Sequence, residues 1–169
     1  MKVYMARMLS CAVLTKLFGS IWGYIPGVLR RRLVRIGQNR FTVTAGAFVF
    51  DHEGRILLLE HEFRPDSRWG IPGGFLDKGE QPEAALRREL LEEVALEVHE
   101  VEFLFARTLP KPRQVEIHFA CKSQGDPKPS SFEICSAGWF ALDDLPEELS
   151  KDQRRLIKRA VDVREKRGG

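Results

Sequence analysis

Three glutamates, Glu89, Glu92 and Glu93, stand three and four residues apart within the segment from Gly73 to Leu96. On a helix this spacing places the three carboxylates on one side, where like charges repel one another. A bound divalent cation removes that repulsion, and carboxylate oxygen is a ligand that Mg²⁺ and Mn²⁺ prefer. Such a cation neutralises phosphate oxygens and lowers the pKa of an attacking water. The pattern therefore indicates a site for a divalent cation.

The elements that must position these carboxylates are a glycine-rich loop and a helix. The segment opens with Gly73 and Gly74 and continues through a polar loop at residues 77–80. A helix is predicted to begin at Pro82, because the missing N–H of proline costs least in the first helical turn. Apolar residues recur every fourth position along this helix and predict one buried face: Leu86, Leu90 and Val94.

The segment resembles a known signature, the Nudix box of the Nudix hydrolases, which cleave nucleoside diphosphates linked to another moiety. The matching residues are Gly74, Glu80 after five residues, and R-E-L-L-E-E-V-A-L at 88–96 after seven more. Every charged position of the box is filled. Ala95 stands where the family has glycine, and a left-handed alanine at a helix end costs about 1–2 kcal/mol. We therefore expect a slightly altered helix terminus with the ligands unaffected.

The resemblance implies a metal site and assigns it residues. Mg²⁺ or Mn²⁺ would be the cofactor, with Glu92, Glu93 and the backbone carbonyl of Gly73 as ligands. Glu89 would be a further ligand or the base that takes a proton from the attacking water. Arg88 would orient a glutamate through an ion pair, so that the catalytic group consists of Arg88, Glu89 and Glu92.

The resemblance also implies supporting carboxylates. Glu80 would have a structural role similar to that of Arg88. Members of the family often draw one further carboxylate from outside the box. Glu133, six residues ahead of Trp139, is the first candidate for that role, and Glu116 is the second.

A loop at residues 63–69 directly precedes the box and is a candidate for substrate binding, since loops beside a site often carry specificity. Arg64 and Arg68 could contact substrate phosphates. Trp69 or Phe63 could stack on a base. The alternative for Trp69 is packing in the core beside the box.

The substrate class follows from the resemblance and stays broad. We expect cleavage of the pyrophosphate link of a nucleoside diphosphate derivative, ADP-ribose or a nucleotide sugar. Family members that act on ADP-ribose tend to have a proline about sixteen residues beyond the box, where Pro112 stands, although prolines are common in turns. No segment resembles the downstream motif of the nicotinamide dinucleotide pyrophosphatases. The alternative is a non-catalytic Nudix-like nucleotide-binding or sensor module, against which the complete box argues.

The order of the remaining elements predicts an α/β (α+β) fold, a mixed sheet with helices on its faces. Strands are predicted at residues 41–50, 56–60, 98–109, 114–122 and 137–142, and a final helix at 151–166. The resemblance implies the Nudix α/β/α sandwich, and we assign residues 41–169 to that domain. His118 alternates with the apolar residues of its strand, so it is expected to face solvent.

Residues 1–40 form a basic, apolar extension that is predicted to be helical. They carry eight basic and no acidic residues, giving +8, whereas the remaining residues carry 19 basic and 24 acidic residues, giving −5. The apolar run from Met8 to Ile25 is interrupted by Lys16, Gly19 and Gly23, so it falls short of a membrane span, and a secretory signal is disfavoured.

Three uses of this extension are open. It could pack on the domain or on a second copy in a homodimer. It could make a peripheral contact with a membrane, with apolar side chains entering and Arg30–Arg32 meeting anionic headgroups. Its arginines could also attract a polyanion, although no specific nucleic-acid motif is present. Three cysteines without paired spacing fit a reducing compartment, so the expected location is the cytoplasm, with or without peripheral membrane association.

Overall fold

The computed structural model describes residues 22, 24–36, 38–64 and 67–168. The chain divides into two units, residues 1–40 and 41–169, which are described separately. In the first unit the structure describes helix α2 (Gly27–Ile36). The part of the extension before Trp22, including most of the predicted apolar run, lies outside the described residues. Among the described helices, none combines the length and apolarity needed to cross a bilayer.

The second unit is built on a sheet of seven strands within the described residues. They are β1 (Thr42–Phe50), β2 (Ile56–His61), β3 (Trp69–Gly70), β4 (Gly73–Phe75), β5 (His99–Leu109), β6 (Gln114–Lys122) and β7 (Ile134–Phe140). The main path runs β3-β2-β1-β6-β5, with β4 paired to β1 and β7 paired to β2. The β1–β6 pair is parallel and the other pairs are antiparallel. The predicted mixed sheet is confirmed.

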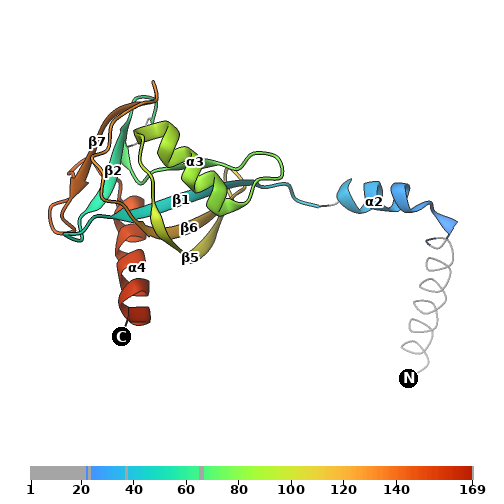
Figure 1. The fold of residues 1–169 in the computed structure, drawn as a ribbon. Helices are drawn as coiled ribbons and strands as arrows, with labels where there is room; N and C mark the ends of the chain where they lie inside the picture. The colour runs from blue at the N-terminus through green and yellow to red at the C-terminus, as the bar shows by residue number, and fades with distance from the viewer. Residues whose placement is uncertain (1–21, 23, 37, 65–66, 169) are drawn as a thin grey trace. The chain divides into compact units, whose positions relative to one another are not determined.

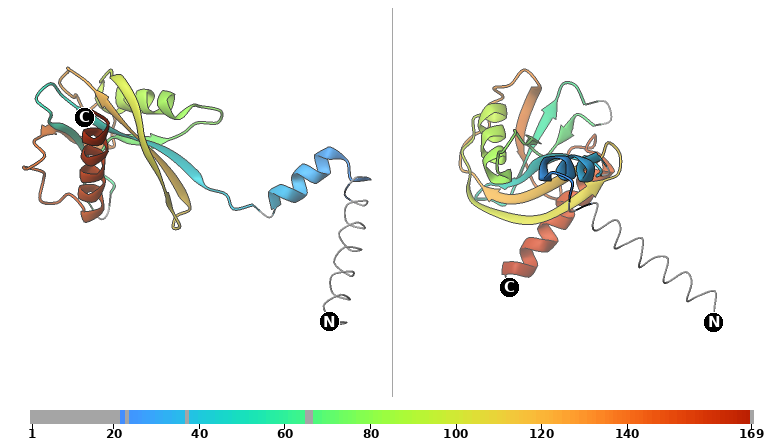
Figure 2. Two further views of the ribbon diagram at one scale, coloured as in Figure 1. Left: turned by 90° about the horizontal axis from the view of Figure 1, so that it is seen from below. Right: turned by 90° about the vertical axis from the view of Figure 1, so that its right-hand side faces the viewer.

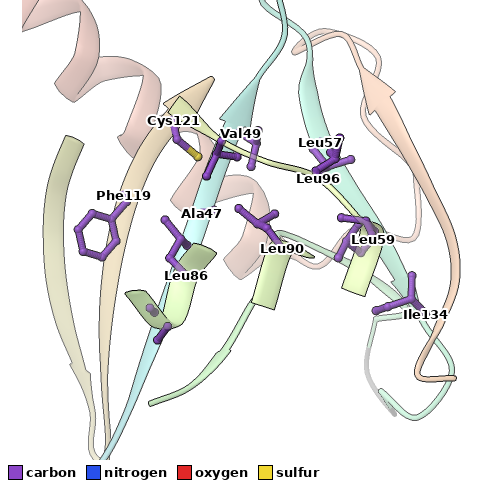
Figure 3. Close-up of a cluster of buried hydrophobic side chains, with 14 residues drawn as sticks. Ala47, Val49, Leu57, Leu59, Leu86, Leu90, Leu96, Phe119, Cys121 and Ile134 are labelled. Atoms are coloured by element: carbon purple, nitrogen blue, oxygen red, sulfur yellow. The ribbon is translucent and has the colours of Figure 1, made fainter. Parts of the chain in front are cut away.

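Helix α3 (Pro82–Val94) covers one face of this sheet and helix α4 (Lys151–Gly168) covers the other (Figures 1 and 2). Successive residues of β1 and β2 point to opposite faces, so both strands supply both cores. Ala47, Val49, Leu57 and Leu59 join the core under α3, which Figure 3 shows with Leu86 and Leu90. Phe48, Phe50, Ile56 and Leu58 join the core under α4. The α/β/α sandwich is confirmed.

The prediction that His118 faces solvent is wrong. Its side chain is only 3% exposed and its ring lies 5.6 Å from the ring of Phe48 and 5.0 Å from that of Phe105. The reason is that β6 lies between β1 and β5 in a sheet covered on both faces, so alternation along the strand does not separate core from solvent.

Strand β7 begins at Ile134, three residues earlier than the sequence pattern predicts. The early start follows from pairing, because Ile134 lies opposite His61 across a bulge in the β2–β7 ladder. This pairing brings the segment just before β7 beside the end of β2. Two stretches that are more than 70 residues apart in sequence thus become neighbours.

Helix α3 ends in a regular left-handed turn in spite of its alanine. Ala95 has φ 54° and ψ 36°, and the N–H of Leu96 donates to the carbonyl of Leu90 at 3.2 Å, as in a Schellman motif. A loop supplies further donors to the helix end: the N–H of Ser130 bonds to the carbonyl of Glu93 at 2.9 Å. The expected alteration of the terminus is absent, and the backbone strain falls on Ala95 itself.

We predict that Ala95→Gly stabilises the domain by about 1 kcal/mol, because glycine removes the cost of a left-handed Cβ. Chemical denaturation measures the change. Ala84→Gly is the matched control: Ala84 lies exposed within α3, where glycine destabilises a helix by about 1 kcal/mol. A loss of stability in both variants would contradict the assignment of strain to Ala95.

Candidate active site

Strand β4 holds the glycines of the box against the centre of the sheet. Residues 73–75 pair with Thr44–Gly46 of β1. Gly73 has φ 144°, and a Cβ on it would collide with the carbonyl oxygen of Ala45. Only glycine fits this position without moving β1. The close approach fixes the backbone of β4, and with it the wall of the site.

The second glycine makes room for a carboxylate. A Cβ on Gly74 would occupy the place of the Glu89 carboxyl group. The backbone N–H of Gly73 donates to Oε2 of Glu93 at 3.4 Å. The missing side chains of β4 therefore let Glu89 and Glu93 of α3 lie directly against the strand.

Arg88 connects the acidic side chains of the box. Its guanidinium donates to both carboxylate oxygens of Glu80, each at 3.0 Å. It also donates to Glu89 at 2.9 Å, to Glu92 at 3.2 Å and to the carbonyl of Phe75 at 3.0 Å. The hydrogen bonds from Arg88 hold the pKa of Glu80 below its ordinary value. One cation thus offsets the repulsion among three carboxylates and ties α3 to the loop before it.

The two carboxylates nearest β4 are poorly solvated. Burial raises the pKa of Glu93 to about 7, and the neighbouring Glu89 carboxylate adds to the shift. Burial also raises the pKa of Glu89, with Arg88 acting in the opposite direction. Glu92 is exposed. A pair of buried carboxylates with elevated pKa values is an environment that a hard cation would stabilise.

The donor set fits Mg²⁺ or Mn²⁺, since it offers carboxylate and carbonyl oxygen only. Within the described ranges, no three histidine, cysteine or acidic side chains are arranged as a ready-made metal site. Glu89 and Glu93 already lie beside the backbone of Gly73 and Gly74. Glu92 bonds to Arg88, and it would exchange that partner for the cation.

A cavity of about 490 Å³ opens beside these carboxylates. Among its walls are Arg64, Gly73, Arg88, Glu89, Glu93 and Glu133. It therefore brings together two of the predicted substrate residues, Arg64 and Glu133, with the predicted metal and catalytic residues of the box. Glu92 is not part of this wall.

Arg68 and Trp69 do not line the cavity. Arg68 donates to Glu62 at 2.9 Å and lies 3.4 Å from Glu60. The ring of Trp69 packs edge-on against Phe140 with centroids 5.1 Å apart, at the side of the α4 core. The structure therefore shows the core packing that was the alternative for Trp69.

Glu116 lies in a second cavity of about 240 Å³ on the α4 side of β1 and β6. It pairs with Arg107, which also binds Asp152 of α4. Burial raises the pKa of Glu116, but the neighbouring His118 ring, whose Nε2 lies 3.4 Å from Oε2 of Glu116, and the guanidinium of Arg107 outweigh it and lower the pKa overall. Arg64 lines both cavities, so its guanidinium is placed between the carboxylates of the box and this second chamber.

Sequence reasoning did not find two features of the site. His61 is buried on the cavity wall, where burial and the charge of Arg64 lower its pKa to about 4. Phe132 lies 6.2 Å from Phe63, ring centroid to centroid, and the rings are 81% and 68% exposed. Phe63 was a stacking candidate, but only the β2–β7 pairing reveals its partner, since no spacing in the sequence relates the two.

The NUDIX domain pattern matches residues 40–160, which is most of the chain. The chain belongs to the Nudix family. The predicted family is thereby confirmed, including the sandwich that the Nudix box implies.

Relatives of the Nudix chain include NAD-capped RNA hydrolases named NudC. The protein of Chromobacterium violaceum is 33% identical over 126 residues, which are 71% of this chain and 47% of the relative. That of Mycobacterium tuberculosis is 31% identical over 106 residues, 60% of this chain and 33% of the relative. The chain spans less than half of the length of either relative.

Solved Nudix structures share the fold. A MutT NUDIX hydrolase from Burkholderia pseudomallei is 29% identical with a TM-score of 0.64, over 72% of this chain and 98% of that one. The NUDIX domain of Shewanella oneidensis NrtR, complexed with ADP ribose, is 20% identical with a TM-score of 0.62, over 85% and 96%. At that identity the second likeness shows the fold alone. Several of these relatives are named as hydrolases, in agreement with the predicted family.

We predict that Arg88→Ala destabilises the domain by about 2 kcal/mol, because it leaves a half-buried cluster of carboxylates without its charged donor. Denaturant unfolding measures the loss. Glu83→Ala is the control on the same helix: Glu83 is exposed and pairs with Arg87, so its loss should cost less than about 1 kcal/mol. Equal losses in the two variants would refute the central role of Arg88.

Proposed function

We propose that this Nudix chain hydrolyses the pyrophosphate link of a nucleoside diphosphate derivative with Mg²⁺ or Mn²⁺ as cofactor. The observation that carries the proposal is the one cavity shared by Glu89, Glu93, Arg88 and Arg64. Carboxylates for a cation and a guanidinium for a phosphate line the same space. Family membership and the complete box support the same reading.

The residues of the Nudix box have different roles in the proposed hydrolysis. Glu92, Glu93 and the carbonyl of Gly73 would hold the cation, which when bound neutralises phosphate oxygens and lowers the pKa of water. Glu89 would be a further ligand or accept the proton from the attacking water. Arg88 acts by position, since its hydrogen bonds to Glu89 and Glu92 orient both carboxylates.

Arg64 is the residue we assign to the substrate phosphates. Its burial lowers its pKa, and the carboxylates of Glu93 and Glu116 oppose this effect. Arg64 is half-buried, and among the described residues its guanidinium forms no ion pair. A guanidinium of this kind suits a phosphate, because its fork of donors matches phosphate oxygens. Glu133 on the same wall would be the carboxylate from outside the box. A role of Arg68 in binding phosphate is supported less, because Arg68 already pairs with Glu62.

The exposed rings of Phe63 and Phe132 would bind the base or other planar group of the substrate. They come from two loops, and Phe63 lines the cavity of the carboxylates. Large apolar side chains are normally buried, and stacking a base on such rings contributes about 1–3 kcal/mol per base. Because Phe63 lines the cavity and Phe132 lies beside Phe63, the two rings favour a substrate with a planar group attached to its phosphates.

The relatives narrow the substrate class. The named activities and ligands among them are hydrolysis of NAD-capped RNA, binding of ADP ribose and hydrolysis by a UDP-X diphosphatase. All three share a diphosphate between a nucleoside and a second group. We infer that ADP-ribose, a dinucleotide or a nucleotide sugar is the substrate. The free thiols of Cys121 and Cys135 support a reducing compartment, the cytoplasm.

A binding or sensor module is the second candidate function. The NrtR NUDIX domain that shares the fold was solved with ADP ribose bound. The network of Arg88 with Glu80, Glu89 and Glu92 favours catalysis, because a module that only binds has no need for a cation site of this kind.

We predict that Glu93→Gln lowers kcat at least about a hundredfold while the fold persists, because a neutral amide is a poor ligand for a hard cation. Chromatography of the nucleoside monophosphate formed from ADP-ribose, NAD, nucleotide sugars and nucleoside triphosphates, with Mg²⁺ or Mn²⁺, measures the rate. Chelation of the metal should abolish it.

Glu83→Gln is the matched control, since Glu83 lies on α3 and, within the described part of the chain, pairs only with Arg87. It should retain the wild-type rate. Near-normal turnover of Glu93→Gln would contradict the metal assignment. Binding of ADP-ribose without turnover of any compound would favour the sensor function instead.

We predict that Phe63→Ala and Phe132→Ala each raise KM about tenfold and leave kcat nearly unchanged, since stacking on one ring contributes about 1–3 kcal/mol to binding. Steady-state kinetics on the best substrate of the panel measures both constants. Phe103→Ala, at another exposed phenylalanine on β5, should leave both constants unchanged. A fall in kcat with unchanged KM would contradict the stacking role.

A further inference from the structure

Helix α2 exposes apolar side chains that the hydrolase function does not explain. Ile36 is 81% exposed, and Val28, Leu29 and Val34 are also exposed. Trp22 and Tyr24, just before the helix, are exposed as well. Several large apolar side chains within fifteen residues are more than the isolated exposed residue that soluble proteins normally carry. This segment, residues 22–36, therefore presents an apolar surface that a binding partner would cover.

The same segment is strongly basic. Arg30, Arg31, Arg32 and Arg35 all belong to the ten residues of α2. Residues 1–40 contain no acidic residue, so their positive charges have no partner within the extension. The partner that fits this segment must therefore be both apolar and negatively charged.

The helical spacing separates these two properties in part, because Val28 and Arg32 lie at the boundaries between the two sides. Leu29 and Ile36 are seven residues apart and lie on one side of α2. Arg31 and Arg35 are four residues apart and lie on a different side. A helix with this division lies in the plane of a membrane surface: the apolar side enters the acyl boundary, and the long arginine side chains reach the headgroups.

We propose that residues 22–36 dock on an anionic membrane surface. Charge disfavours pairing with the same extension of a second copy, because such pairing places +8 against +8 without an acidic residue between them. The exposed apolar side chains favour a membrane over a nucleic acid as the partner. A phosphate backbone accounts for the arginines, but it leaves Leu29 and Ile36 in water. The inference is independent of the proposed hydrolysis.

The test uses the full chain and sedimentation with vesicles. Vesicles of phosphatidylcholine with about one-third phosphatidylglycerol should pellet the protein, and vesicles of phosphatidylcholine alone should not. Raising the salt concentration should weaken the binding, since exposed charges are screened within about 10 Å at 0.1 M salt. Equal binding to both kinds of vesicle, or to neither, would overturn the proposal.

The arginines are tested by the triple variant Arg31→Gln, Arg32→Gln, Arg35→Gln. Each basic residue near an anionic surface contributes about fivefold to binding, so the variant should bind roughly a hundredfold more weakly. The matched control removes three charges from the exposed side of α4: Lys151→Gln, Arg155→Gln and Lys158→Gln. The control should bind as the wild type does. A similar loss in both variants would show general charge attraction and overturn the assignment to α2.

The apolar side is tested by Leu29→Ser with Ile36→Ser. This variant should lose binding while all arginines remain. The emission of Trp22 should shift to shorter wavelength on binding, and Trp22→Phe should remove that shift. The proposal would be overturned if light scattering gave a dimer mass for the wild type, the Leu29→Ser, Ile36→Ser variant were a monomer, and the wild type did not bind vesicles. That result would assign the surface to a second copy. The proposal would also be overturned if the wild type bound single-stranded RNA through the α2 arginines and did not bind vesicles.

The fold of each variant is checked by circular dichroism and by the hydrolysis assay in solution, which should be unchanged because the candidate active site is built from residues of the second unit. Failure of the membrane proposal would leave hydrolysis intact. Failure of the hydrolase proposal would leave vesicle binding intact, so the two results are distinguishable.

Discussion

Repulsion among carboxylates on α3 is the constraint on which the site depends. Glu89, Glu92 and Glu93 would destabilise an ordinary helix, and Glu80 adds a fourth negative charge beside them. Arg88 meets this repulsion by binding Glu80, Glu89 and Glu92 at once. Glu93 accepts from the N–H of Gly73, pairs with no cationic side chain among the described residues, and has a raised pKa. The arrangement therefore neutralises one part of the cluster and leaves the other part without a cationic partner in the described structure.

The rest of the fold serves to keep that cluster against β4. Strand β1 pairs with β6 along its length and with β4 at Thr44–Gly46, so the glycines of the box are fixed to the centre of the sheet. The apolar side of α3 then fills the core over β1 and β2. Packing density in such a core leaves little freedom to shift the helix. The carboxylates are therefore positioned by tertiary structure rather than by helix propensity.

The sequence predicted those parts of the fold and site that depend on local spacing. The box, the helix that starts at Pro82 and the buried side of that helix follow from residues that are near one another in the chain. His118 was misread because alternation identifies a core face only when the other face is wet, and α4 covers that face. Arg64 and Glu133 were proposed individually, but their convergence, and the contact of Phe63 with Phe132, depend on strand pairing between distant segments. No spacing rule encodes such pairing.

The loop before β7 has two attachments that are close together in sequence. At one end, the hydroxyl of Ser130 donates to the carbonyl of Glu92 at 2.6 Å, so the loop is fastened to the end of α3. At the other end, two residues later, it carries Phe132 opposite Phe63. An insertion or deletion between these points would release the helix end and displace the ring together. Divergence of specificity at this edge must therefore proceed by exchange of side chains, while the length of the loop stays fixed.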